Sequence, residues 1–355
     1  MTLYLITVLT ALRVAFVGDP QVDNPQELKY ARQSLYSELR ARTDLDLVVI
    51  LGDLVNENPS LIAPSEATLD SLRCPWVRVQ GNHDGPVSCG DTTLLYPGLR
   101  FILLDNVRRS RRSGYEAGLN NAQKHWLDSL VKASRDCRIV VCTHIPMSES
   151  RSLDSLSNIL APSRDVLLVS GHTHSVDRHI LERGMEEVIA GASCGMWWRG
   201  VKGEDGIPNA LMNCGSPRGY FIADFRPRKE RWYTLDYKCV GRPESDRASA
   251  RLKDGALTIN VYGGSREGVL EVREGHRWVE AAHRYVPAPE ALDIVEWNKR
   301  VMTKEYKKAH REEFIPMRSL PSPHVWVLDN YDNKTGSVDI RYRDGAFTFR
   351  TTLSL

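Results

Sequence analysis

Five short polar motifs follow apolar runs in the first half of this chain of 355 residues. Each apolar run, such as Leu47-Val48-Val49-Ile50-Leu51, has the length and β-branched content of a buried strand. Polar side chains at the same end of several strands converge on one edge of a sheet, where open α/β sheets place their active sites. The spacing therefore predicts one polar site built from five loops. In chain order the motifs are Asp19-Pro20-Gln21, Gly52-Asp53, Gly81-Asn82-His83-Asp84, Thr143-His144 and Gly171-His172-Thr173-His174.

The motifs contain the residue types that bind pairs of metal ions. Two divalent ions close together need a shared oxygen ligand, and they lower the pKa of a bridging water and clamp the oxygens of a phosphoryl group. Asp53 follows a glycine at a strand end and is suited to bridge the ions, while Asn82 offers a carbonyl oxygen. Neutral imidazoles come from His144, His172 and His174. A turn or a core histidine explains each motif taken singly, but their joint occurrence favours a metal-dependent hydrolase.

As a set, the five motifs resemble those of the calcineurin-like metallophosphoesterase superfamily, over residues 13–225. The resemblance implies a two-sheet β-sandwich flanked by helices, a dinuclear centre of iron, manganese, zinc or nickel, and a metal-bridging hydroxide as the nucleophile. It implies that His83 does not bind metal but contacts the phosphate and assists the leaving group. By the same resemblance, the first metal is bound by Asp19, Gln21, Asp53 and His174, and the second by Asp53, Asn82, His144 and His172.

Two positions depart from the family pattern. The first motif usually ends in His, whereas this chain has Gln21. An amide oxygen is a harder and weaker ligand than imidazole, so we expect a more loosely bound first metal, shifted towards manganese or iron. The second motif often continues to another acidic residue, where this chain has Asn56-Glu57. We interpret Asn56 as support for the loop and not as a ligand.

A second resemblance lies downstream, in the segments around Trp197-Trp198, Asp205-Gly206 and Gly215-Ser216 and in His324-Val325-Trp326. It is to a bacterial subgroup in which a β-rich domain follows the phosphoesterase domain, and whose members are commonly exported. An extracytoplasmic location is therefore slightly favoured over a cytoplasmic one.

Aromatic and cationic residues in the same region are candidates for substrate binding. Adjacent tryptophans alternate sides on an extended chain, so one could face the cleft and stack a base or sugar while a neighbouring arginine binds phosphate. An aromatic plug at the domain junction is the alternative. The cleft is expected to be bounded mainly by residues 197–199 and by the loop 203–218. The predicted substrate-binding residues are Trp197, Trp198, Arg199 and Arg218.

The elements that must position these residues alternate between strands and helices up to about Phe225, as in an α/β layered domain. Helices are predicted over Gln26–Arg42 and Asn121–Ser134, the latter capped by Asn120 or Asn121. Beyond Arg226, alternation with a period of two residues predicts a smaller all-β sandwich, interrupted by a polar helical segment over 289–313. We therefore predict a phosphoesterase domain over 13–225 and a β-rich domain over 226–355. Residues 1–12 are either the remnant of a leader or an edge strand.

Composition excludes several other classes of protein. A net charge of +2 gives no reason to expect a nucleic-acid polymer as partner. Seven cysteines without a CxxC pair form neither a disulfide framework nor a zinc site. The apolar stretch Leu3–Leu12 is too short to span a bilayer.

The leading prediction is thus a hydrolase that uses two metal ions (manganese, iron or zinc) on a small phosphoester, with a diester favoured over a monoester. One alternative is a glycan- or protein-binding module that carries a catalytically weak phosphoesterase-like domain. The departure at Gln21 is the sequence feature that favours weak catalysis. The oligomeric state stays open.

Overall fold

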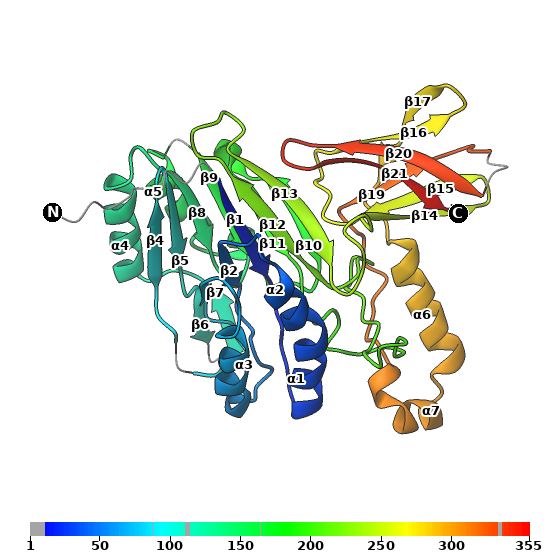
Figure 1. Ribbon diagram of the computed structural model, residues 1–355, viewed down its shortest axis with the longest axis horizontal. Helices are drawn as coiled ribbons and strands as arrows, with labels where there is room; N and C mark the ends of the chain where they lie inside the picture. The colour runs from blue at the N-terminus through cyan, green and yellow to red at the C-terminus, as the bar shows by residue number, and fades with distance from the viewer. Residues whose placement is uncertain (1–10, 87, 111–113, 164, 333–335) are drawn as a thin grey trace.

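The computed structural model describes residues 11–86, 88–110, 114–163, 165–332 and 336–355. The predicted leader or edge strand therefore lies, up to residue 10, outside the described residues. Two β-sheets pack face to face in the N-terminal part of the molecule, and two smaller sheets form the C-terminal part, shown at the upper right of Figure 1.

The first sheet contains the strands that carry the first three motifs. Strands β1, β2 and β3 run parallel, β12 is antiparallel to β1, and β13 is antiparallel to β12. The parallel arrangement places the ends of β1, β2 and β3 at one edge of the sheet. In spatial order the strands are β13 (Tyr233–Cys239), β12 (Gly219–Phe225), β1 (Leu12–Val17), β2 (Leu47–Ile50) and β3 (Trp76–Arg78).

The second sheet carries the last two motifs. Its four central strands are parallel and its two edge strands are antiparallel to their neighbours. Phe16 of the first sheet, Phe101 of the second and Phe225 of the first pack against one another, with ring centroids 5.5–6.5 Å apart. In spatial order the strands are β10 (Val176–Ile180), β11 (Glu186–Ala190), β9 (Val166–Ser170), β8 (Arg138–Cys142), β5 (Leu99–Leu103) and β4 (Thr92–Tyr96).

Helices cover the outer faces of this pair of sheets. The predicted helix over 26–42 is confirmed, with a π-helical stretch at 32–36 between α1 (Pro25–Ala31) and α2 (Ser37–Ala41). The predicted capping by Asn120 is also confirmed, since its side chain and that of Gln123 form a reciprocal capping box. The other helices of this part are α3 (Ile62–Leu69), α4 (Asn121–Lys132) and α5 (Leu153–Leu160), and a separate hairpin joins β6 (Val107–Ser110) to β7 (Gly114–Ala117). The fold is the expected two-sheet sandwich flanked by helices.

The C-terminal part is an all-β sandwich, as predicted. Its two four-stranded sheets share one core, in which Ile259 and Trp326 of one sheet lie in the same cluster as Ile340 of the other. One sheet contains β14 (Ala248–Lys253), β15 (Ala256–Val261), β19 (Val325–Leu328) and β18 (Ala282–His283). The other contains β17 (Arg277–Glu280), β16 (Val269–Glu274), β20 (Ser337–Arg343) and β21 (Thr348–Ser354).

One strand of the region predicted as the C-terminal sandwich belongs elsewhere. The β-rich domain was predicted over 226–355, but β13, which lies within that range, pairs with β12 over seven residues and lies at the edge of the first sheet. The helical segment predicted over 289–313 forms α6 (Pro289–Val301) and α7 (Lys304–Ala309), which lead down from the sandwich beside the loops of the N-terminal part (Figure 1). Among the described residues, no helix combines the length and the apolar character that crossing a membrane requires.

Candidate metal centre

The five motifs follow the carboxyl ends of five parallel strands, β1, β2, β3, β8 and β9, and the two sheets bring them together. Glycines make the close approach of these loops possible. A Cβ atom on Gly81 would lie 2.0 Å from the backbone nitrogen of Asp53, and one on Gly52 would lie 2.6 Å from Nδ1 of His144. The glycines of the Gly-Asp and Gly-Asn motifs are therefore required by packing.

The backbone at the predicted ligands is strained. Five of them are non-glycine residues in the left-handed region, which bulkier residues rarely adopt. Such strain persists only where the surroundings impose it, and it is concentrated at functional sites. The φ angles are 39° at Asp19, 41° at Gln21, 47° at Asp53, 73° at His172 and 51° at His174.

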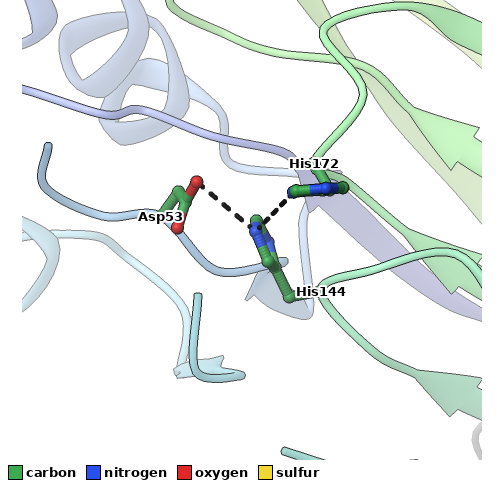
Figure 2. A group of neighbouring side chains, drawn as sticks. All are labelled: Asp53, His144 and His172. Atoms are coloured by element: carbon green, nitrogen blue, oxygen red, sulfur yellow. Dashed lines mark hydrogen bonds and ion pairs between the residues drawn. The ribbon is translucent and has the colours of Figure 1, made fainter. Parts of the chain in front are cut away.

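Asp53, His144 and His172 form the centre of the cluster (Figure 2). Nε2 of His144 lies 3.4 Å from Oδ2 of Asp53 and 3.2 Å from Nδ1 of His172. The same nitrogen lies 2.8 Å from Oδ1 of Asn82. One ligand atom from each of the three residues in Figure 2 lies within 4.8 Å of the other two, which is close enough for one cation to contact all three.

Asp19 and Gln21 lie beside this centre. Oδ2 of Asp19 accepts a hydrogen bond from the backbone N–H of His172 at 2.7 Å, whereas its buried Oδ1 accepts no hydrogen bond from the described residues. Gln21 directs its amide nitrogen to Oδ2 of Asp53 at 3.5 Å and to Oδ1 of Asn56 at 3.4 Å. To bind a cation through its oxygen, the Gln21 amide would have to turn about its last bond.

Hydrogen bonds fix the orientation of two of the histidines. Nδ1 of His144 is hydrogen-bonded to the carbonyl of Leu51 at 2.8 Å, and Nδ1 of His174 to the carbonyl of Gly195 at 2.6 Å. When Nδ1–H donates to a carbonyl, the lone pair of Nε2 is left for a metal. In both histidines the hydrogen bond to the backbone therefore leaves Nε2 as the ring nitrogen that can bind a metal.

The electrostatics of the site suit a cation. Burial lowers the pKa of His172 to about 3 and that of His174 to about 4, so both rings are neutral at pH 7, as metal ligation requires. Burial acts in the same direction on His144, but Asp53 and Asp19 outweigh it and raise the pKa of that ring to about 10, so metal binding there would displace a proton. Burial also raises the pKa of Asp19; the neighbouring His144 lowers it in part, and Asp53 raises it again, because two buried carboxylates repel each other. A cation would offset this repulsion and could contact Oδ1 of Asp19, which accepts no hydrogen bond from the part of the chain that the structure describes and lies 3.5 Å from Nδ1 of His144. The donor set of carboxylate, amide and imidazole therefore fits a transition-metal pair.

The His83 side chain lines the same cavity as the predicted ligands, but its ring is hydrogen-bonded to Glu57. The backbone N–H of His83 donates to Oδ1 of Asp53 at 2.8 Å, which holds the loop, while Nδ1 of its ring lies 2.9 Å from Oε1 of Glu57. The His83 side chain is 30% exposed and lines a cavity. The next residue, Asp84, links the second and third motif loops, because its carboxylate accepts hydrogen bonds from the backbone N–H groups of Val55 and Gly81. Sequence reasoning noted Glu57 only as a neighbour, and its partnership with His83 was missed.

A cavity of about 470 Å³ opens above the cluster. Ligand-type residues and His83 form part of its lining, and segments distant in the sequence form the rest. Trp197 is one of these, and its ring centroid lies 5.0 Å from that of His174. The full lining is Gln21, Asp53, His83, Tyr115, Glu149, His172, Thr173, His174, Met196, Trp197, Asn213, Pro316, Arg318 and Leu320.

The predicted boundary of this cavity needs correction. Trp198 is 2% exposed, donates its indole N–H to the carbonyl of Pro20 at 2.8 Å, and packs under the guanidinium of Arg218. Trp198 and Arg218 are therefore buried supports of the first motif and do not line the cavity, nor does Arg199. Of the four predicted substrate-binding residues, only Trp197 lines it. Tyr115, Glu149 and Arg318 were missed, since no local pattern marks them.

Comparison with known proteins is consistent with this arrangement. A family model described as "Calcineurin-like phosphoesterase" matches residues 12–176, and one described as "C terminal of Calcineurin-like phosphoesterase" matches residues 187–346. A protein of Synechococcus sp. named "Probable cyclic nucleotide phosphodiesterase" is 25% identical over 162 residues. That match covers 40% of this chain and 62% of the relative, so it spans about three fifths of the relative's length.

Two solved structures match part of the chain. A dimetal phosphatase from Danio rerio is 14% identical, with 70% of this chain and 95% of that chain covered and a TM-score of 0.45. A 5'-nucleotidase from Candida albicans is 12% identical, with 64% of this chain and 51% of that chain covered and a TM-score of 0.40.

Proposed function

The chain belongs to the calcineurin-like phosphoesterase family, and from this premise we propose that it hydrolyses a phosphodiester at a dinuclear metal centre. The observation that carries the proposal is the convergence of carboxylate, amide and imidazole donors from five separate loops, with Asp53 at their centre. The strained backbone and the buried Oδ1 of Asp19, which accepts no hydrogen bond from the described residues, support the same interpretation.

The metals would be held by residues that already face one another. Asp53 is the proposed bridge, with Asp19, Gln21 and His174 on one side and Asn82, His144 and His172 on the other. When bound, such a pair activates water and neutralises the charge of a phosphoryl group. The site would accept manganese, iron or zinc, and the amide of Gln21 favours the harder ions.

The chain's own residues would bind the substrate and move a proton. His83 lines the cavity and is paired with Glu57, so its ring is held where it can contact the phosphoryl group and protonate the leaving oxygen. Trp197 offers an aromatic face beside His174. Met196, Pro316 and Leu320 add apolar surface to the wall of the cavity.

A diester is proposed over a monoester for two reasons. A phosphodiester has two organic substituents, and a cavity of about 470 Å³ with an apolar wall has room for the second. The relative from Synechococcus is named a probable cyclic nucleotide phosphodiesterase, which supports the same choice.

Metal content and turnover test this proposal together. Protein depleted of metal and then loaded with manganese, iron or zinc is analysed for bound metal and assayed with bis(4-nitrophenyl) phosphate and 4-nitrophenyl phosphate. We expect two metal equivalents and a higher kcat/KM for the diester. Stoichiometric metal without hydrolysis of any phosphoester in a wider panel would contradict the proposed function and favour a binding module. A preference for the monoester would contradict only the choice of substrate class.

Trp197→Ala is expected to raise KM for diesters that carry a base or sugar by roughly 5–100-fold, because stacking on an aromatic ring contributes about 1–3 kcal/mol. A small aliphatic phosphodiester should be hydrolysed nearly as before. Trp278→Ala, on a strand of the C-terminal sandwich, is the matched control. An equal loss of activity on ring-bearing and aliphatic diesters would show that Trp197 has a structural role and does not bind the substrate.

Glu57→Gln is expected to lower kcat about 10-fold while KM and bound metal stay unchanged, because loss of an orienting partner typically costs 10–100-fold in activity. The reason is that the Glu57 carboxylate is the hydrogen-bond partner of the His83 ring at 2.9 Å. Steady-state kinetics and elemental analysis provide the measurement. Glu66→Gln, which removes an ion pair with Arg78 outside the cavity lining, should have no effect on kcat.

A further inference from the structure

A segment of the C-terminal part of the chain forms one wall of the cavity. Residues 315–320, here called the strap, lead from the helical segment towards β19. Pro316, Arg318 and Leu320 line the cavity, whereas Ile315 and Met317 are buried. This alternation is that of an extended chain, whose successive side chains point to opposite sides. The strap therefore presents every second side chain to the predicted metal centre.

The buried side of the strap fixes its position. Ile315 and Met317 pack with Met196 and Ala291 in one apolar cluster, so the strap contacts both the segment before Trp197 and helix α6. Asn298 of α6 donates a hydrogen bond to the carbonyl of Ile315 at 2.7 Å. These contacts hold the strap against the cavity.

Gly200 allows this close approach. It has a φ of 129°, and a Cβ atom there would lie 3.0 Å from Cδ1 of Ile315. Its backbone N–H also donates to the carbonyl of Glu312 at 2.9 Å, just before the strap begins. The strap therefore packs closely against the segment that carries Trp197.

Arg318 is the only lysine or arginine among the described residues that line the cavity. Its side chain is exposed, and it forms no ion pair or hydrogen bond with the residues that the structure describes. Other arginines of the chain are paired, for example Arg178 with Glu186 and Asp344. A guanidinium that faces a cavity and has no carboxylate partner is available to an anionic ligand.

We propose that Arg318 binds a second phosphate group of the substrate, so that the preferred substrates are phosphodiesters of a ring compound that carries a further phosphate. This proposal rests on the proposed function, because the scissile phosphoryl group must lie at the metal centre for Arg318 to meet another one. The guanidinium fork matches phosphate oxygens in a bidentate geometry. Trp197 would contact the ring between the two phosphates.

Ligand binding tests the assignment without relying on turnover. Calorimetry measures the affinities of adenosine 5′-monophosphate, adenosine 5′-diphosphate and adenosine 3′,5′-bisphosphate for the metal-loaded protein, in a His83→Ala background that slows hydrolysis. We expect at least one of the two ligands with an added phosphate to bind roughly tenfold more tightly than the monophosphate, as one charge-assisted contact at an exposed site provides. Arg318→Gln should reduce this preference to within about twofold. Arg318→Lys should retain part of it, because the charge stays while the fork is lost.

A matched control and a turnover assay separate the possible failures. Arg311→Gln removes an exposed arginine of the same part of the chain that does not line the cavity, and it should leave the preference intact. If the wild type hydrolyses bis(4-nitrophenyl) phosphate but neither added phosphate strengthens binding, Arg318 does not bind a second phosphate and the proposed function stands. The same conclusion follows if the preference persists in Arg318→Gln. If metal-loaded protein neither binds the monophosphate nor hydrolyses any phosphoester, the proposed function fails and the role of Arg318 fails with it.

Discussion

Asp53→Asn should remove most of the bound metal and nearly all hydrolysis of phosphoesters. Asp53 lies at the centre of the donor cluster, 3.4 Å from Nε2 of His144 and 3.5 Å from the Gln21 amide. A carboxylate shared by two ions is the ligand on which both depend. Its replacement should therefore lower metal affinity and activity by more than the roughly 10–100-fold that loss of an outer hydrogen-bond partner typically costs. Elemental analysis and kcat/KM for bis(4-nitrophenyl) phosphate provide the measurements.

The control for this variant is Asp84→Asn. Asp84 is an equally buried carboxylate in the same group of loops, and it accepts hydrogen bonds from two backbone N–H groups. An amide oxygen can still accept one of these bonds, so this control should keep its metal. Folding of Asp53→Asn is checked by circular dichroism, since an amide at this position can still accept the backbone N–H of His83. Full metal occupancy in Asp53→Asn would rule out a bridging role.

His83→Ala should retain both metals while kcat falls on the order of 10²–10⁴-fold, as expected for loss of a group that transfers a proton or stabilises charge. The ring of His83 points to Glu57 and the cavity, whereas Asn82 from the same loop contacts His144. The loss should be larger for an alkyl leaving group than for 4-nitrophenolate, which departs without protonation.

His125→Ala is the matched control for this experiment, because His125 is exposed on α4 and lies outside the cavity lining. It should change neither metal content nor rate. Parallel loss of metal and rate in His83→Ala would instead place His83 among the ligands.

Much of the fold could be predicted because local pattern and tertiary structure agree in it. The helix after Asn120 has its capping box and its apolar face within one short segment. The strand Tyr233–Cys239 was misplaced because alternation with a period of two residues is the same in either sheet. Only its pairing with Gly219–Phe225 decides between them, and that contact leaves no mark in the sequence of the strand.

The candidate site likewise contains residues that a local sequence pattern marks and residues that no such pattern marks. The ligand-type residues stand in motifs at strand ends, so their loops could be recognised, although metal binding by each of them stays a prediction. The sequence pattern allowed one tryptophan to face the cleft and the other to pack inward, but it could not tell which, and both were named as substrate-binding residues. In the structure both lie in a tight turn, with φ angles of 58° and 53°, and Trp197 lines the cavity whereas Trp198 is buried. Arg318 enters the cavity from more than a hundred residues beyond the last motif, where no local pattern points to it.

The position of β13 has a consequence for any shortened form of the protein. The strand covers the edge of β12 over seven residue pairs and buries Leu235, Tyr237 and Cys239. A chain cut after residue 225 would retain every predicted metal ligand but leave β12 with a row of unpaired N–H and C=O groups. Such an edge is a template for intermolecular strand pairing, so the shortened protein would be prone to self-association. The shortest soluble fragment with an intact first sheet must therefore extend through Cys239.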